Sequence, residues 1–170
     1  PLLLMGHGGG LHKRSPGLVA RARQAVVHDR FHVAAIDAPG HGDRARSRQD
    51  QRWVDALLRA RQEGQPFSPI IAPFNGSLAE RAVPEWRITI DALQSLPEIG
   101  AGAPIGYSGM TIASAIGIPL AAAEPRILLS RSVDQAGMHH GAAHGDAGRL
   151  RHRHHRQAQP LLDLAEQRKG

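Results

Sequence analysis

The sequence predicts an α/β fold, a parallel sheet with helices on both faces. Two short runs of apolar residues, 2–5 and 31–36, each lead into a glycine-rich turn. Neither run alternates polar with apolar residues, which is typical of strands buried on both faces of a parallel sheet. Between them, Ser15-Pro16 marks a helix start, and a helix to about Val27 completes a right-handed strand–helix–strand unit.

The alternation of helices and strands continues to about residue 126. Hydrophobic periodicity and proline positions set the remaining boundaries. The elements expected in order are a helix over 49–63, a proline-rich loop over 65–74, a helix over 84–97, a strand over 104–108 and an apolar helix over 111–117. The three strands are expected to lie side by side, with the turns that follow 2–5 and 104–108 at the same sheet edge.

Composition excludes several classes of protein. The 170 residues suffice for one domain with a core. The absence of cysteine rules out disulfides and thiolate metal sites, and no apolar run reaches the ~20 residues that span a bilayer. We therefore expect a soluble, cytoplasmic protein with no membrane partner. No dinucleotide fingerprint is present, and we expect no cofactor.

Composition changes abruptly near residue 127. Six of the eleven histidines, and a cluster of arginines over 149–156, follow that point, while hydrophobic periodicity fades. We expect residues 127–170 to be an irregular His/Arg-rich tail, either disordered or translated from a shifted reading frame. This would leave the strand over 104–108 unpaired on one side. The tail's imidazoles suit a transition metal and its arginines an acidic surface, but no scaffold fixes them, so we expect no metal site and no nucleic-acid partner.

A glycine cluster, His7-Gly8-Gly9-Gly10, follows the first strand. Glycines allow a sharp bend and leave backbone N–H groups unobstructed, which suits an oxyanion hole. A glycine-rich turn without catalytic duty and a phosphate cradle remain alternatives at this point.

The second glycine-rich turn reads Asp37-Ala38-Pro39-Gly40-His41-Gly42-Asp43. H-G-G-G after one strand and D-x-P-G-H-G after the next resemble the α/β-hydrolase superfamily, especially its bacterial esterase-like and dienelactone-hydrolase-like members. The resemblance covers residues 1–126 and implies a partial, three-layer α/β-hydrolase fold, with 49–82 as a cap or insert. It implies hydrolysis of a small-molecule ester or lactone. Asp37 and His41 are interpreted as structural turn residues.

The family places its nucleophile in G-x-S-x-G, on a strained turn between a strand and a helix. Two registers compete here. Gly109-Met110-Thr111-Ile112-Ala113 has small flanking residues but puts threonine at the turn, whereas Gly106-Tyr107-Ser108-Gly109-Met110 keeps the serine. We favour Thr111, with Ser108 as the alternative. The N–H of Ile112 would then form an oxyanion hole with that of Gly8 or Gly9.

The family's acid and histidine should follow the nucleophile in that order. Aspartates and histidines are present beyond residue 127, but none follows an identifiable strand at the family's spacing. We therefore expect an acyl hydrolase that is weakly active or inactive. The alternatives are a truncated, non-catalytic hydrolase remnant and, ranked last, a basic His-rich binding tail on an inert core. The sequence makes no prediction of oligomeric state.

Overall fold

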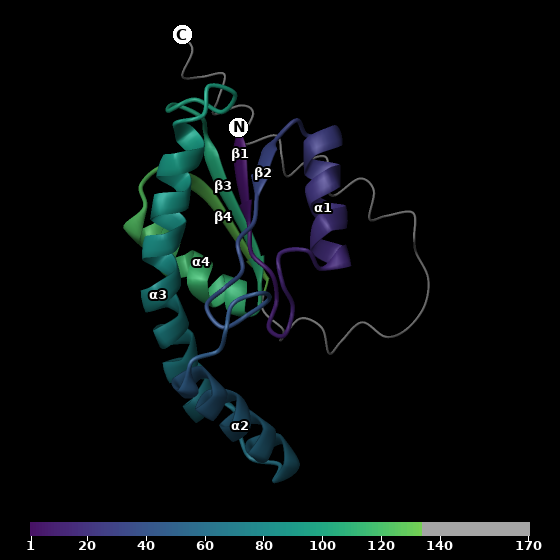
Figure 1. Ribbon diagram of the computed structural model, residues 1–170, viewed down its shortest axis with the longest axis vertical. Coiled ribbons are helices and arrows are strands. Elements are labelled where there is room, and N and C mark those ends of the chain that lie inside the picture. Colours follow the sequence, from purple (N-terminus) through teal and green to yellow (C-terminus); the bar gives the residue numbers. More distant parts are fainter. Residues whose placement is uncertain (134–170) are drawn as a thin grey trace.

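The computed structural model describes residues 1–133, which form a four-stranded parallel sheet between helices (Figure 1). The strands are β1 (Leu2–Met5), β2 (His32–Ala34), β3 (Ile105–Met110) and β4 (Ile127–Val133). Their order across the sheet is β2-β1-β3-β4, and each neighbouring pair is parallel. The predicted α/β class and the three adjacent strands are confirmed.

The register of the sheet decides which turns meet. Leu2 lies opposite both His32 and Ile105, and Met5 lies opposite Ser108. Because β1 and β3 run in parallel from the same level, the segments that follow them leave the sheet at the same edge. The glycine loop after Met5 and the turn after Met110 are therefore neighbours.

Helices cover both faces of the sheet. On one face, Ala25 of α1 (Pro16–Val27) and Phe31, just before β2, pack against Leu3 and Val33. On the other face lie α3 (Ser68–Gln94) and α4 (Ile112–Ala123) (Figure 1). The three-layer arrangement expected from the sequence is confirmed.

The main core lies between the sheet and α3 and α4. Its buried members include Leu2, Leu4, Leu78, Trp86, Ile90, Ile105, Tyr107, Ile116 and Leu120. The rings of Trp86 and Tyr107 meet edge to face with centroids 5.9 Å apart, a favourable aromatic geometry. The Tyr107 hydroxyl donates to the carbonyl of Ala113 at 2.9 Å, so its polar end is satisfied inside the core. This contact fixes β3 to the start of α4.

Two helices are longer than the sequence predicts. The prediction of a loop over 65–74 is wrong. Helix α3 begins at Ser68 and continues through two prolines. Its buried stripe has a residue at every fourth position, and packing of this stripe outweighs the local cost of proline. The stripe consists of Phe74, Leu78, Ala82, Trp86 and Ile90. Likewise, α4 passes the expected end at Gly117 and extends to Ala123.

Helix α2 (Arg48–Gln62) and the start of α3 project beyond the sheet (Figure 1). They leave from the end of the sheet at which β1 and β3 finish, so they lie on the side of the glycine loop. Asp50 closes a capping box with Ser47 and pairs with Arg81 of α3 at 2.6 Å. The expected cap region, 49–82, thus corresponds to this helical pair, and its role as a cap stays a prediction.

Strand β4 corrects the expected boundary at residue 127. It pairs with β3 along its length, so the prediction that β3 has an unpaired side is wrong. The strand starts where Arg126 holds buried Glu124 at 2.7 Å and also contacts Asp91 of α3 at 2.7 Å. The Arg126 hydrogen bonds lower the pKa of Glu124 to about 2, against the effect of burial. The rest of the predicted tail, 134–170, lies outside the described residues.

Candidate functional site

Thr111 is the junction between β3, which ends at Met110, and α4, which begins at Ile112. Its φ of 55° and ψ of −113° lie outside the regions that residues with a Cβ normally occupy. A β-branched residue makes this conformation more costly still, and such strain clusters at functional sites. Its side chain makes no capping bond to α4, so its hydroxyl is left to face another element.

Small residues make this tight turn possible. A Cβ placed on Gly109 would lie 2.7 Å from the Cβ of Ala113, and one on Gly6 would lie 2.6 Å from the Tyr107 hydroxyl and collide with Ala113. Real side chains do not approach so closely, so β1, β3 and α4 meet only because these positions are glycine. Gly109 and Ala113 are the two small residues that flank Thr111 in the favoured register.

Ser108, the alternative nucleophile, lies within β3 rather than in the turn. It sits opposite Met5, and its carbonyl accepts the N–H of Gly6 at 2.8 Å. Within residues 1–133, the non-glycine residues with positive φ are Arg30 and Thr111. Ser108 therefore lacks the strained backbone that distinguishes Thr111.

The glycine loop reaches the hydroxyl of Thr111. The N–H of Gly9 donates to Thr111 Oγ1 at 3.1 Å, in a position open to solvent. Gly8 lies close by, because a Cβ there would be 3.3 Å from Oγ1. Ile112 is the first residue of α4, so its N–H has no acceptor within the helix. The structure thus brings four of the predicted residues together: Gly8, Gly9, Thr111 and Ile112.

The side chain of His7 holds this loop in position, a role that was not predicted from the sequence. Its buried ring accepts the N–H of Ala38 at Nε2, 3.0 Å away, so the proton of the neutral ring is on Nδ1. That Nδ1 lies 2.9 Å from the carbonyl of Gly8 and donates to it. Burial lowers the pKa of His7, in keeping with a neutral ring. Because the Gly8 carbonyl and the Gly9 N–H share one peptide plane, His7 orients the donor that faces Thr111.

Asp37 acts as a structural turn residue, as interpreted from the sequence. Its buried carboxylate accepts the backbone N–H of Lys13 at 2.6 Å and pairs with Lys13 Nζ at 2.7 Å. Burial alone would raise the pKa of Asp37, but the hydrogen bonds from Lys13 outweigh it and lower the pKa to about 2. The turn after β2 is thereby tied to the loop after β1.

Within residues 1–128, whose side chains the structure describes, no basic side chain is hydrogen-bonded to Thr111 Oγ1. Both ring nitrogens of His7 are already hydrogen-bonded, to Ala38 and to Gly8. His41 packs 5.5 Å from the His7 ring and contacts the carbonyl of Pro39 at 3.0 Å. The acid and histidine candidates beyond residue 133 lie outside the described part of the chain. Over that part there is also no group of three or more His, Cys, Asp or Glu that could hold a metal ion, nor a helix long and apolar enough to cross a membrane.

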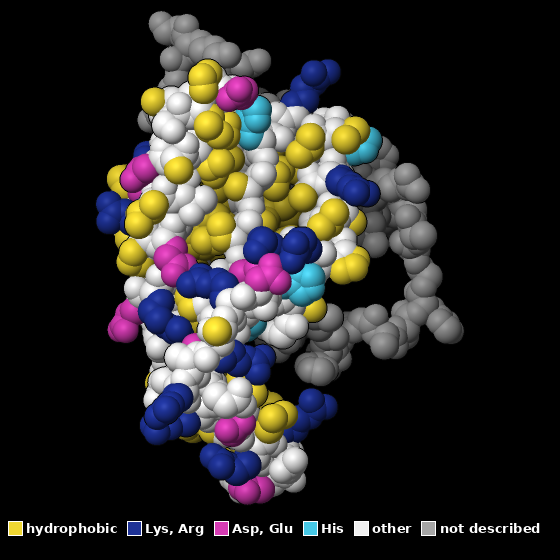
Figure 2. Space-filling view, viewed as in Figure 1, with side chains coloured by type: hydrophobic (Ala, Val, Ile, Leu, Met, Phe, Trp, Pro, Cys, Tyr) yellow, Lys and Arg dark blue, Asp and Glu magenta, His cyan; other side chains and the backbone are white. Residues whose placement is uncertain are grey.

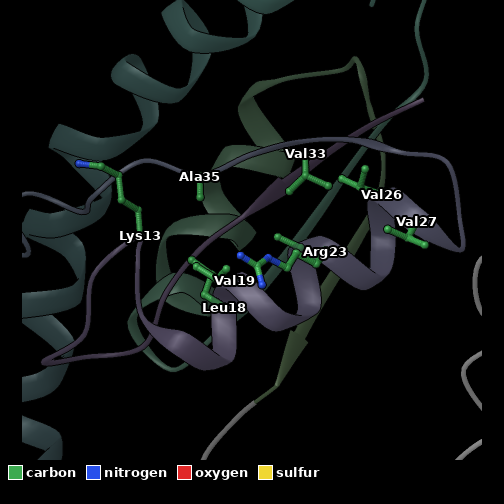
Figure 3. A pocket seen from close by; sticks show the side chains of 9 residues that line it. Lys13, Leu18, Val19, Arg23, Val26, Val27, Val33 and Ala35 are labelled. Atoms are coloured by element: carbon green, nitrogen blue, oxygen red, sulfur yellow. The ribbon is translucent and has the colours of Figure 1, made fainter.

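A largely apolar hollow of about 310 Å³ lies between α1 and the outer strand β2. Figure 3 shows Val19 and Arg23 of α1 on one side and Val33 and Ala35 on the other. None of its lining residues comes from the Gly8–Gly9 loop or the Thr111 turn. The hollow is therefore separate from the candidate site.

Comparison with solved structures finds a protein of similar fold. The chain resembles the solved structure of a cold-adapted esterase from an Arctic intertidal metagenomic library. Sequence identity is 27% and the TM-score is 0.54, over 78% of this chain and 48% of the esterase chain. The match therefore spans about half the length of that protein. No protein-family model and no curated protein matches the sequence.

Proposed function

We propose that the chain carries the nucleophile of an α/β-hydrolase-type ester or lactone hydrolase acting on a small-molecule acyl substrate. Thr111 is the attacking residue, and the N–H groups of Gly9 and Ile112 are the oxyanion donors. The proposal rests on one observation: the strained backbone of Thr111 with the Gly9 N–H on its hydroxyl. Likeness to an esterase supports the reaction class.

The reaction follows from this arrangement. Thr111 Oγ1 attacks the ester carbonyl carbon, and the carbonyl oxygen gains negative charge beside the N–H groups of Gly9 and Ile112. Collapse of this intermediate breaks the bond to the alcohol, which leaves with the proton that Thr111 has lost. Water then attacks the acyl-threonine, releasing the acid and restoring the hydroxyl.

Turnover should be weak. Over residues 1–133 no imidazole is hydrogen-bonded to Thr111 Oγ1, so this part of the chain supplies no base to take its proton. Oxyanion donors and binding alone leave about 10³–10⁴-fold acceleration over water when triad members are missing. The same observation favours the second candidate function, a non-catalytic hydrolase remnant that retains the binding surface.

Covalent labelling with a fluorophosphonate, read by mass spectrometry beside hydrolysis of a short-chain p-nitrophenyl ester, tests the proposal. We expect label on Thr111, loss of label and turnover in Thr111→Ala, and retention of both in Ser108→Ala. Thr111→Ser should react faster, because it removes the methyl group that crowds the turn.

The controls separate the alternatives. Loss of label in Ser108→Ala but not in Thr111→Ala would identify Ser108 as the nucleophile. Absence of label and of turnover in both the unmodified protein and Thr111→Ser would favour the inactive remnant.

A further inference from the structure

A polar cleft of about 310 Å³ lies beside the glycine loop, between the turns that follow β1 and β2. Its walls include Gly10 and Leu11 from the first turn, and His41, Arg44 and Arg46 from the second. A volume of this size is at the lower end of the range for small-molecule sites. The cleft starts one residue from Gly9, the donor to Thr111 Oγ1.

One cation that lines this cleft has no carboxylate partner within the described chain. Each surrounding carboxylate has a cation of its own within 2.7 Å. These pairs are Asp37–Lys13, Asp43–Arg14, Glu85–Arg44 and Asp50–Arg81. Arg46 makes only a long hydrogen bond of 3.4 Å to the Gly40 carbonyl, and within the described chain it pairs with no carboxylate. The cleft therefore carries a surplus positive charge, on Arg46.

Arg44 cannot supply a second free cation. Its two terminal nitrogens donate to the Glu85 carboxylate at 2.6 and 2.7 Å. One of them also donates to the backbone carbonyl of Asp37 at 3.0 Å. Arg44 forms a fixed wall, and Arg46 offers the free guanidinium. Figure 2 shows that Lys and Arg side chains gather over the lower part of this face, where α2 lies.

Tight turns shape the backbone of the cleft. Gly10, Gly40 and Gly42 have φ values of 73°, 71° and 61°. The N–H groups of Leu11, His41 and Asp43, which follow these glycines, are hydrogen-bonded within the turns, so Arg46 supplies the donors that can meet an anion. A guanidinium beside such a turn matches a carboxylate, because its N–H groups can bind both oxygens.

We infer that this cleft binds a carboxylate of the substrate, so that the preferred substrate is a half-ester of a short dicarboxylic acid. The inference rests on the proposed function, because it places the ester carbonyl at Thr111 and the free carboxylate at Arg46. Gly10 lines the cleft and is the chain neighbour of Gly9, which is bonded to Thr111 Oγ1, so the two positions adjoin along the glycine loop.

Binding measured by calorimetry on the full chain tests the inference without requiring turnover. The probes are monomethyl succinate and dimethyl succinate. We expect the half-ester to bind about tenfold more tightly than the diester, from one charge-assisted contact. Arg46→Gln should remove this preference. Arg59→Gln makes the same charge change in the last turn of α2, about 16 Å along the helix from its first residue, Arg48, and should preserve the preference.

The possible results distinguish the cleft from the reaction. Equal affinity for the two probes would overturn the inference. So would an equal loss of the half-ester preference in Arg46→Gln and Arg59→Gln. Tight half-ester binding without hydrolysis of any ester would uphold the cleft and reject the proposed function. Hydrolysis of both esters without preference would do the reverse.

Discussion

The N–H of Gly9 donates a 3.1 Å hydrogen bond to the hydroxyl of Thr111, across 102 residues of sequence. The two residues meet because each follows a strand and the two strands, β1 and β3, are parallel neighbours in register. A backbone donor and a hydroxyl on a strained turn thus share one solvent-open point.

Gly109→Ala should destabilise the fold by at least about 2–3 kcal/mol, the usual cost of overpacking a close contact. Its new Cβ would lie 2.7 Å from the Ala113 side chain and 2.9 Å from the Ala113 backbone, so α4 must move away from β3. Urea unfolding followed by circular dichroism measures the change.

Gly76→Ala is the matched control for this substitution. Gly76 lies within α3, and a Cβ there would meet nothing within 4 Å. Alanine in an exposed helix should raise the free energy of unfolding by about 0.5–1 kcal/mol. If both variants lose stability equally, the close approach of β3 and α4 is not a constraint.

Thr111→Gly should raise the free energy of unfolding by about 1 kcal/mol. Strain at a positive φ costs about 1–3 kcal/mol, and glycine relieves it at a smaller entropic cost. The same change at Thr89, whose backbone is helical, should lower stability by about 0.3 kcal/mol, the difference in helix propensity between threonine and glycine. Thermal unfolding of the pair would contradict the prediction if Thr111→Gly loses as much as Thr89→Gly.

The sequence was sufficient to predict how the sheet and the site loop are placed. The unbroken apolar run at 2–5 indicates a buried parallel strand, and 104–108, which lies between glycine-containing turns, is the strand expected beside it. Parallel strands bring their carboxyl ends to one edge, so the meeting of the glycine loop and Thr111 follows from topology alone.

Features set by tertiary packing could not be predicted in this way. Pro73 and Pro84 argue locally against a continuous helix, and only the buried stripe against the sheet outweighs them. The role of His7 was hidden for a similar reason, because Ala38, its partner at Nε2, is 31 residues away. The apolar residues 127–129 could start a strand, but β4 was not predicted because Arg131 and the two serines beside it, Ser130 and Ser132, break the apolar pattern.

His7 should make stability sensitive to pH below neutrality. Burial lowers its pKa from 6.5, so the folded protein favours the neutral ring. Its contribution is complete above pH 6.5 and is lost as the pH falls through the folded pKa. His7→Leu should cost about 1–3 kcal/mol at pH 7.5, because the N–H of Ala38 loses its partner. Between pH 7.5 and pH 5, the His7→Leu variant should also lose less stability than the unmodified protein loses.

Urea unfolding at the two pH values measures both effects. His32→Leu, on the exposed edge strand, is the control and should keep the original pH dependence. If His7→Leu and His32→Leu respond alike to pH, His7 does not brace the loop through its neutral ring.

Asp37 should matter for stability at neutral pH and cease to matter in strong acid. Its pKa falls from 3.8 to about 2 in the folded protein, so its contribution is present above about pH 4 and is lost as the pH falls toward 2. Asp37→Asn should therefore lower the free energy of unfolding by about 2 kcal/mol at pH 7, less than a fully buried pair because Lys13 is 36% exposed. Near pH 2 the free energies of unfolding of the variant and the unmodified protein should converge.

The control is Asp43→Asn. The Asp43 side chain is 66% exposed, so this change should alter stability by less than about 0.5 kcal/mol at pH 7. A gap for Asp37→Asn that persists at pH 2 would show that shape, not charge, ties the two turns together.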